Sequence, residues 1–499
     1  MNLVQKFYHS FKKYSTNRAF CIGGKDISYG EFLEYINGAR KLIDSKINKK
    51  GIPIGIICFD NIETYAVIFA TWFSGNYFIP INPKHPCARN NLIIENTGIK
   101  NIFSVINEVE NIICTDDIQL LNNLGQKTIQ NSLPVETEPE QLMYILTTSG
   151  STGVPKYVPI NEKNVDAYCT GFLNLYPDLK PTVNFLQTYD LTSDAAFTGY
   201  LLPLLIGASV FTVPNDSFKF LSIAKLISNK QITWVKLTPS VLNYLTPYIP
   251  KLDLKHIEHV IFGGEALQLS LLKKWQGVFQ GADFSNLYGP TETTISATAY
   301  RFSNIENAKS RNGVISIGKP FLEVECVVID RNSNILGVKK EGNLCIGGNQ
   351  TMKGYLKKGG KSEFVELNLN NKKKRFYITG DIVTEDKNGY YYFLGRSDDQ
   401  VKIEGYRVNL IEVEKLVRNV IPDCNTFVIA HEKLEGLKRL YVFVEGFMGE
   451  FAEIKHKLET QLPGHMVPDE IFAVPKFPFT ASGKIDKTKL KNEYLLSLK

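Results

Sequence analysis

Up to about residue 300 the chain alternates between two hydrophobic patterns. In residues 218–231 (FKFLSIAKLISNKQ) apolar positions recur at helical spacing, and a short apolar run follows at 232–237 (ITWVKL). This alternation is typical of parallel βαβ layers. The longest apolar stretch, 65–81 (YAVIFATWFSGNYFIPI), is interrupted at residues 74–76. We therefore expect a buried helix that runs into a strand, and no membrane insertion.

From about residue 313 the pattern becomes rich in strands, as in 323–330 (EVECVVID), 341–348 (EGNLCIGG) and 389–395 (GYYYFLG). Alternating β-branched and aromatic residues in short runs favour strands over helices. The basic run 368–375 (NLNNKKKR) is predicted to be the solvated loop of a hairpin between two of them. These features predict a β-rich subdomain.

The pattern changes again after the polar stretch 397–400 (SDDQ), which suits a hinge between two hydrophobic units. Beyond it we expect a helix near 409–420, strands within 426–446 and a helix near 450–462. The predicted fold class is α/β, with a large N-terminal domain of layered βαβ sheets plus the β-rich subdomain (1–396). A small C-terminal α+β domain (397–499) follows, and Asp398 is the predicted hinge.

Composition narrows the class of protein. A chain of 499 residues exceeds one ordinary core, and its 43% hydrophobic and 22% charged residues are those of a folded soluble protein. The formal charge of +6 is too mild to indicate a nucleic-acid binder. The eight cysteines form no CxxC pair, so we expect reduced thiols, no zinc site and a cytoplasmic location. The N-terminal residues contain no apolar core of a signal peptide.

Residues 147–153 (TTSGSTG) contain only threonine, serine and glycine, and Lys156 follows them. Glycine lets the backbone approach a ligand closely, and successive amides form a nest for anions, so the loop predicts a phosphate site. A P-loop would need Gly-Lys-Ser/Thr at its end. Here Lys156 lies between Pro155 and Tyr157, which excludes a P-loop kinase.

The loop resembles the phosphate loop of the adenylate-forming superfamily, which includes acyl-CoA synthetases, luciferases and the amino-acid adenylation domains of non-ribosomal peptide synthetases. Six further segments, before and after this loop, occur in the same order as in that superfamily. They are 81–89 (INPKHPCAR, with Asn82 where the superfamily has aspartate), 262–267 (FGGEAL), 286–294 (NLYGPTETT), 377–383 (YITGDIV), 395–408 (GRSDDQVKIEGYRV) and 478–487 (PFTASGKIDK). The matches cover nearly the whole chain, and stand-alone D-alanine–carrier protein ligases are close in design.

The resemblance implies that ATP and a carboxylate form an acyl adenylate and pyrophosphate, with Mg²⁺ as cofactor. It assigns the β- and γ-phosphates to the loop and the lysine after it: Thr147, Thr148, Ser149, Gly150, Ser151, Thr152, Gly153 and Lys156. Tyr288 would lie along the adenine, Thr291 would touch the α-phosphate, and Glu292 would hold Mg²⁺, which prefers carboxylate oxygen.

The rest of the nucleotide site is implied in the same way. The adenine and substrate wall would comprise Gly263, Gly264, Glu265, Leu287 and Gly289. Asp381 would bind both ribose hydroxyls, since a carboxylate accepts two hydrogen bonds, and Arg396 would reach the ribose or a phosphate. Lys484 would bridge the α-phosphate and the substrate carboxylate, where charge develops in the transition state.

One stretch concerns the acid that is activated. Tyr189–Asp190 resembles the Phe-Asp pair with which the superfamily grips a substrate amine. An ungapped alignment between Leu186 and Ala208 instead places Asp194 there, with Ser193, Ala196 and Thr198 departing from the commoner residues, so Asp190 is expected to be a loop residue. Position by position, the substrate pocket comprises Asp194, Ala195, Thr198, Leu237, Ile261, Gly263, Leu287, Ile295 and Ser296. Apart from Asp194 this set holds no charge, which predicts a small or medium apolar side chain on the substrate.

The predicted function is therefore activation of an amino acid as aminoacyl-AMP, followed by transfer to the phosphopantetheine thiol of a separate carrier protein. The resemblance implies that a monomeric enzyme swings its mobile C-terminal domain about Asp398, so that KIEGYRV (402–408) replaces Lys484 at the site. Glu404 departs from the superfamily's basic or small residue there. An acyl- or aryl-CoA ligase and a catalytically inactive binding protein remain alternatives; the joint presence of Lys484, Glu292 and Asp381 argues against the second.

Overall fold

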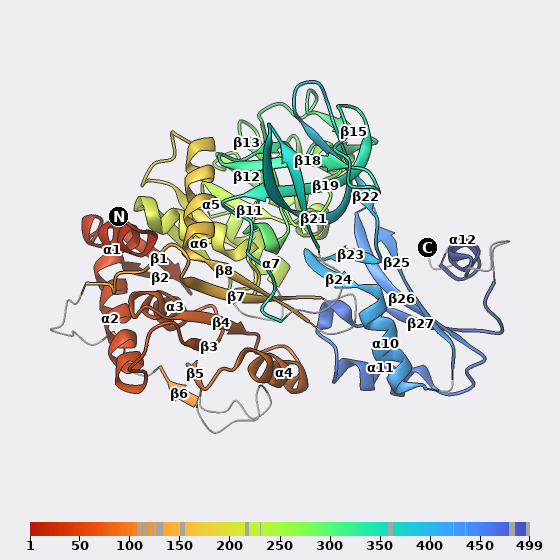
Figure 1. Cartoon of the computed structure of the whole chain (residues 1–499), viewed down its shortest axis with the longest axis horizontal. Coiled ribbons are helices and arrows are strands. Elements are labelled where there is room, and N and C mark those ends of the chain that lie inside the picture. The colour runs from red at the N-terminus through yellow and green to blue at the C-terminus, as the bar shows by residue number, and fades with distance from the viewer. Residues whose placement is uncertain are drawn as a thin grey trace.

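The computed structural model describes residues 1–106, 112, 118–121, 124–125, 133–149, 155–214, 219–229, 231–357, 363–422, 424–434, 436–478 and 485–495. The first part of the chain forms two large sheets with their helices, and a β-rich unit and a C-terminal unit follow (Figure 1). Among the described residues, no helix combines the length and the apolar character needed to cross a membrane.

One sheet has six strands in the order β6-β5-β3-β4-β7-β8. Its neighbours pair in parallel except for β7 and β8, which form an antiparallel edge. The strands are β6 (Ile118–Leu120), β5 (Asn101–Ser104), β3 (Pro53–Ile57), β4 (Tyr77–Ile81), β7 (Leu142–Thr148) and β8 (Lys156–Asn161). The connection from β7 to β8 is the Ser/Thr/Gly loop, of which residues 150–154 lie outside the described residues.

The other sheet has nine strands, and those between β13 and β1 pair in parallel. In sheet order they are β17 (Lys319–Pro320), β14 (Thr298–Phe302), β13 (Asp283–Tyr288), β12 (His259–Gly263), β11 (Trp234–Leu237), β9 (Asn184–Gln187), β10 (Ser209–Thr212), β1 (Arg18–Ile22) and β2 (Lys25–Ser28). A mostly parallel sheet covered by helices is what the alternating pattern predicted.

The largest hydrophobic core joins residues of both sheets with five helices. These are α1 (Leu3–Lys13), α2 (Tyr29–Lys46), α3 (Ile62–Phe73), α5 (Glu162–Leu175) and α6 (Ala195–Ile206). A second core forms beside β11–β13 with α7 (Lys219–Ile227), α8 (Pro239–Leu245), η1 (Thr246–Lys251) and α9 (Leu269–Trp275), and α4 (Cys87–Thr97) packs on the six-stranded sheet. The predicted helix and strand within 65–81 are confirmed as α3 and β4.

The β-rich unit is an antiparallel sheet. It comprises β18 (Val324–Ile329), β19 (Glu341–Gly348), β20 (Phe364–Leu369), β21 (Lys372–Glu385) and β22 (Tyr391–Arg396), with the short pair β15 (Ser310–Arg311) and β16 (Val314–Ile315) nearby. The predicted hairpin at 368–375 is confirmed, and Asn370 and Asn371 turn it with positive φ. Its lysines, however, belong to β21 rather than to a loop.

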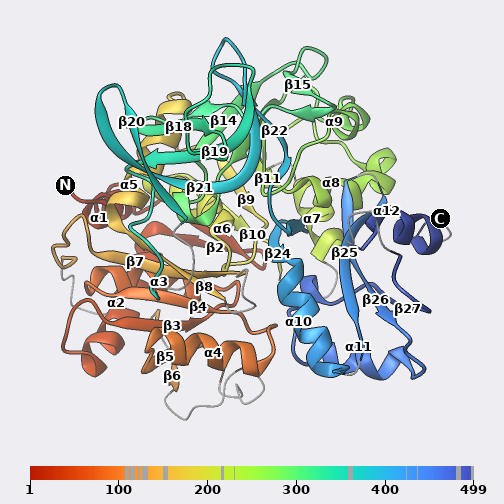
Figure 2. The same cartoon turned by 45° about the vertical axis from the view of Figure 1, so that its right-hand side comes forward.

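The C-terminal unit begins with a two-stranded hairpin and has its own core. Its elements are β23 (Gln400–Ile403), β24 (Tyr406–Asn409), α10 (Leu410–Val420), β25 (Thr426–Leu434), β26 (Leu437–Glu445), α11 (Phe451–Glu459), η3 (Gly464–Met466), β27 (Glu470–Val474), α12 (Lys487–Leu490) and η4 (Lys491–Leu495). The helices and strands expected beyond residue 408 are confirmed, as is the α/β fold class. Figures 1 and 2 both place α12 at the outer edge of this unit.

Candidate functional site

The candidate site lies where the carboxyl ends of β11, β12 and β13 meet the β23–β24 hairpin. In open α/β sheets ligands bind outside the carboxyl ends of the strands. One cavity is lined from the sheet side by Asp194, Lys236 and Gly263, and from the hairpin by Lys402 and Arg407. An adjoining cavity shares several of its residues and extends towards the β-rich unit, where its lining includes Glu265, Tyr288, Asp381 and Arg396.

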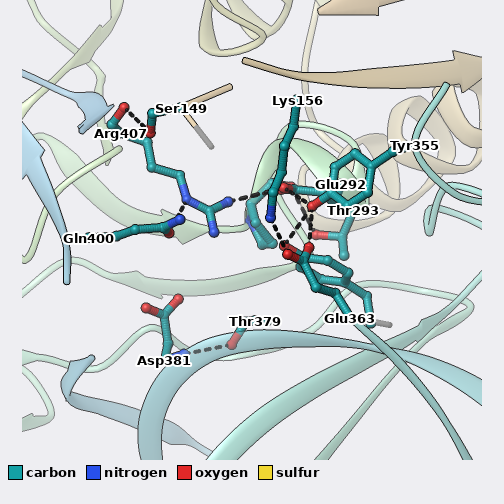
Figure 3. Close-up of polar contacts among 12 residues, drawn as sticks. Ser149, Lys156, Glu292, Thr293, Tyr355, Glu363, Thr379, Asp381, Gln400 and Arg407 are labelled. Carbon is teal, nitrogen blue, oxygen red and sulfur yellow. Dashed lines mark hydrogen bonds and ion pairs between the residues drawn. The ribbon is translucent and has the colours of Figure 1, made fainter. Parts of the chain in front are cut away.

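The predicted phosphate residues fall into two groups. Thr147 and Thr148 end β7 and line the first cavity together with Ser149, whose hydroxyl donates to the Arg407 carbonyl at 2.8 Å. Gly150, Ser151, Thr152 and Gly153 lie outside the described residues. Lys156 begins β8, where its ammonium forms an ion pair with Glu363 and lies 5.0 Å from the ring centre of Tyr355 (Figure 3).

Glu292 is fully buried in the short helix η2 (Thr291–Thr293). Its carboxylate accepts from the Tyr355 hydroxyl at 2.8 Å and from the Arg407 guanidinium, which lies 3.1 Å from both oxygens (Figure 3). Burial raises the pKa of Glu292, but the Arg407 charge and the hydrogen bonds to the carboxylate together hold that pKa below its usual value. Glu292 is therefore a buried anion.

The fit of Glu292 to Mg²⁺ depends on the orientation of the hairpin. Within the described ranges, no group of three or more His, Cys, Asp or Glu side chains could hold a metal alone. Mg²⁺ commonly takes one or two protein carboxylates and completes its shell with phosphate oxygens and water. The single carboxylate of Glu292 fits that requirement, but Arg407 engages both of its oxygens in this arrangement.

The residues predicted to bind the ribose and adenine form a chain of polar contacts across β13, β21 and β22. The Tyr288 hydroxyl donates to Asp381, whose other oxygen pairs with Arg396. Arg396 also binds Asp398 through two contacts of 2.7 Å. Burial raises the pKa of Asp398, but the hydrogen bonds and charge of Arg396 hold it below its usual value. The predicted hinge residue is therefore an ion-paired anion. Asp381, Arg396 and Tyr288 are thus brought together as the sequence predicted.

Two residues of the predicted adenine wall have other contacts. The Glu265 carboxylate accepts from the Ser240 hydroxyl and backbone amide, and from the Gly405 amide at 2.7 Å. It therefore anchors the hairpin in this orientation. Gly289 is required by packing, because an added Cβ would lie 2.7 Å from the backbone at Ser296.

Asp194 directly precedes α6 and lines the first cavity. Its Oδ2 atom is buried and has no hydrogen-bond partner among the described residues. Burial raises the pKa of its carboxyl, against a hydrogen bond with Thr291 and the positive charge of Lys236. Asp190 differs, because Asn82 and Thr192 donate to its carboxylate at 3.0 and 2.7 Å. The structure thus leaves Asp194, and not Asp190, with an acceptor that has no partner among the described residues.

The remaining predicted substrate residues are divided between the cavity and the core. Those that line the cavity are Ala195, Gly263, Leu287, Ile295 and Ser296. Ile295 has a φ of 68°, which is uncommon for a β-branched residue and strains the backbone at the site. Thr198 and Ile261 are fully buried behind the lining.

The prediction for Leu237 is wrong. Its side chain belongs to the second core, on the opposite face of β11 from the cavity. Lys236 pairs in register with Ile261, so Lys236 and not Leu237 shares the cavity face. The strand's period of two makes a shift of one residue exchange the faces. The expectation that Asp194 is the only charge in the pocket fails for the same reason, and the position of Ile261 was the signal that could have identified Lys236.

The hairpin is held by contacts across the domain boundary and by contacts within its own domain. Arg89 of α4 pairs with Glu412 of α10 across the boundary at 2.9 Å. Within the C-terminal domain, Tyr406 stacks on His465 with 4.1 Å between ring centres. Glu404, which stands where the superfamily has a basic or small residue, accepts a hydrogen bond from Arg439 at 2.7 Å. Lys484 lies outside the described residues.

Comparisons with known proteins agree with this architecture. A family model described as "AMP-binding enzyme" matches residues 7–356. Gramicidin S synthase 2 of Brevibacillus brevis is 26% identical over 99% of this chain, which spans 11% of that protein. Zwittermicin A synthase ZmaJ of Bacillus cereus is 29% identical over 93% of this chain and 90% of its own length. The solved structure of holo-PA1221, described as an NRPS protein containing adenylation and PCP domains, superposes with a TM-score of 0.85 at 23% identity, covering 99% of this chain and 84% of that one.

Proposed function

The chain belongs to the family of AMP-binding enzymes, and on that premise we propose that it activates an amino acid as aminoacyl-AMP and transfers it to the phosphopantetheine thiol of a separate carrier protein. Enzymes of this family are ligases that use ATP, and the superfamily and fold class inferred from the motifs are confirmed. Amino-acid selection, Mg²⁺ and the carrier acceptor are the proposed parts.

The observation that carries the proposal is the Asp194 carboxylate. Asp194 lines the cavity, and one of its oxygens is buried without a hydrogen-bond partner among the described residues, which costs free energy unless a ligand supplies a donor. A protonated substrate amine would supply both the donor and the opposite charge. A fatty or aromatic acid would leave the carboxylate unpaired at a cost of several kcal/mol.

In the first half-reaction, Thr147, Thr148, Ser149 and Lys156 would position the phosphates, and Thr291 would lie between the α-phosphate and the amine held by Asp194. The pair of Asp381 and Arg396 would bind the ribose beside Tyr288. This arrangement supports catalysis by orientation and charge compensation. Glu292 would hold Mg²⁺, which offsets phosphate charge. Lys484, assigned by its motif alone, would bridge the reacting oxygens.

The second half-reaction is supported by the position of the hairpin. Arg407 engages both oxygens of Glu292, and Gly405 is hydrogen-bonded to Glu265. The hairpin at the site and Mg²⁺ on Glu292 therefore compete for one carboxylate. We infer that the described orientation belongs to the state after pyrophosphate release, and that the domain turns about Asp398. The PCP domain of PA1221 makes a carrier protein the natural acceptor.

The test is ATP–pyrophosphate exchange with amino acids and with their deaminated counterparts. We expect exchange only with acids that carry an amine, and loss of that selectivity in Asp194→Asn. Asp190→Asn is the matched control, because its carboxylate is already bonded to Asn82 and Thr192. Exchange with fatty or aromatic acids alone would replace the proposal with an acyl- or aryl-CoA ligase.

A further inference from the structure

Lys236 is a buried charge that the proposed reaction leaves without a role. It lies in the middle of β11, is 3% exposed and lines the cavity beside Asp194. Its ammonium donates to the Thr198 hydroxyl at 2.7 Å and to the Ala195 carbonyl at 3.2 Å. An ammonium has three donors, so one remains without a partner in the described part of the chain.

The contacts of Lys236 do not neutralise its charge. Thr198 and Ala195 contribute neutral oxygens, and Tyr189 places its ring 5.2 Å from the ammonium. No described carboxylate forms an ion pair with Lys236. Asp194 acts on it only at longer range, and burial lowers the pKa of Lys236 to about 7. A buried cation without a counter-ion is costly unless a ligand completes it.

The geometry around this lysine also limits what can lie beside it. Asp194 and Lys236 reach the same cavity from the start of α6 and from β11, while Leu287 and Ile295 bound it with hydrocarbon. An apolar substrate side chain would place hydrocarbon against an ammonium that has one unused donor. An acidic side chain would supply both the acceptor and the charge.

We propose that Lys236 binds the side-chain carboxylate of the substrate, so that the enzyme activates an amino acid with a short acidic side chain, of the aspartate class. This inference rests on the proposed function, in which Asp194 binds the amine. The two residues would then bind two charged groups of one substrate. Asp194 would bind the ammonium, and Lys236 would bind the second carboxylate. The carboxylate that reacts with ATP would remain directed towards Thr291.

The first arm of the test compares substrates on the unaltered protein. Pyrophosphate exchange is measured with aspartate, glutamate, asparagine and 2-aminobutyrate, and with succinate, which has both carboxylates and no amine. We expect kcat/KM for aspartate or glutamate to exceed that for asparagine by about 100-fold, the range of a lost buried charge pair. Equal or better exchange with asparagine or 2-aminobutyrate would overturn the inference.

The second arm uses Lys236→Met, which removes the charge while keeping a similar volume, with exposed Lys41→Met on α2 as the control. We expect kcat/KM for the acidic substrate to fall by about 100-fold, while that for asparagine is unchanged or rises. Thermal melting and ATP binding establish that the variant folds, and Lys236→Gln serves if it does not. Retention of the preference for an acidic side chain in a folded variant would overturn the inference.

The substrates also separate this inference from the proposed function. If succinate exchanges as well as aspartate, and both depend on Lys236, the role of Lys236 stands and the role of Asp194 as amine site fails. If neutral amino acids exchange and acidic ones do not, amino-acid activation stands and the inference fails. If no amino acid supports exchange, both fail.

Discussion

The cavity has two walls that are held in place by different forces. The sheet wall, made of Asp194, Lys236, Gly263, Leu287 and Ile295, is carried by strands, a helix and a loop continuous with the largest core. The hairpin wall, made of residues 402–407, is held by polar contacts across a domain boundary. Ligands and water can replace polar contacts, whereas opening a hydrophobic core costs several kcal/mol. We propose that the sheet wall selects the acid and that the hairpin wall determines the half-reaction.

The largest effect should separate the two half-reactions. Lys484→Ala should reduce aminoacyl-adenylate formation by about 3–4 kcal/mol of transition-state stabilisation, because it removes a charge from the reacting oxygens. Thioester formation from supplied aminoacyl-AMP should be nearly unchanged, since the hairpin occupies the site in that step. The rates of adenylate formation and of thioester formation are measured separately, with Lys489→Ala as the control. Equal loss of both would contradict the alternation of domains.

The sheet wall is broken at Asp194. Asp194→Ala should weaken amino-acid binding by about 3 kcal/mol, since a substrate ammonium would be buried without its partner. Binding of ATP should hardly change. Asp190→Ala should cost roughly 1 kcal/mol, as expected for a polar loop residue. Amino-acid-dependent exchange measures both variants, and a larger loss at Asp190 would mean that the amine lies elsewhere.

The hairpin wall is broken at Arg407. Arg407→Met should slow thioester transfer by about 10- to 100-fold, because the hairpin loses its ion pair with Glu292. Pyrophosphate exchange should be maintained or should need less Mg²⁺, since Glu292 is released. The surface pair of Arg418 and Glu414 provides the control, Arg418→Met. An equal loss of exchange would place Arg407 in the first half-reaction as well.

The smallest effect is a pH dependence confined to the sheet wall. Burial lowers the pKa of Lys236 to about 7, so in the free protein its ammonium is present below that pH and is lost above it. Asp194 opposes this shift, and burial keeps Tyr168 and Tyr189 neutral by raising their pKa. KM for aspartate should therefore rise above about pH 7, by up to about tenfold per pH unit, relative to KM for asparagine.

Two comparisons check that assignment. Lys402 faces the same cavity, and its pKa is also lowered by burial, so the dependence must be shown to come from Lys236. It should disappear in Lys236→Met and persist in Lys41→Met. A ratio of the two KM values that stays flat from about pH 6 to 9 in the unaltered protein would show that Lys236 does not bind an acidic group.

Much of the fold could be predicted from the sequence because its signals are local. The periodicity of α10 and the turn residues Asn370 and Asn371 identified their elements to within a few residues. Tyr288, Asp381 and Arg396 also lie together, as the resemblance to the superfamily implied.

The missed features depend on register or on distant contacts. Leu237 was assigned to the cavity in place of Lys236, a shift of one residue along β11 that exchanges the two faces of the strand. The contacts of Arg407 with Glu292 and of Gly405 with Glu265 join residues more than 100 positions apart. These contacts depend on how the C-terminal domain is oriented on the N-terminal domain. Local sequence patterns contain no information about that orientation.

The central claim is that the sheet wall selects an amino acid by binding its amine, so that its carboxylate is activated by ATP, and trapping the adenylate tests this claim most directly. The protein is incubated with ATP, Mg²⁺, hydroxylamine and a mixture of amino acids, fatty acids and aromatic acids. Hydroxylamine converts each acyl adenylate to a hydroxamate, which mass spectrometry identifies by its mass. The account predicts a hydroxamate with a free amine, foremost that of an acidic amino acid, and its loss in Asp194→Ala. Hydroxamates of fatty or aromatic acids alone, undiminished in Asp194→Ala, would contradict it.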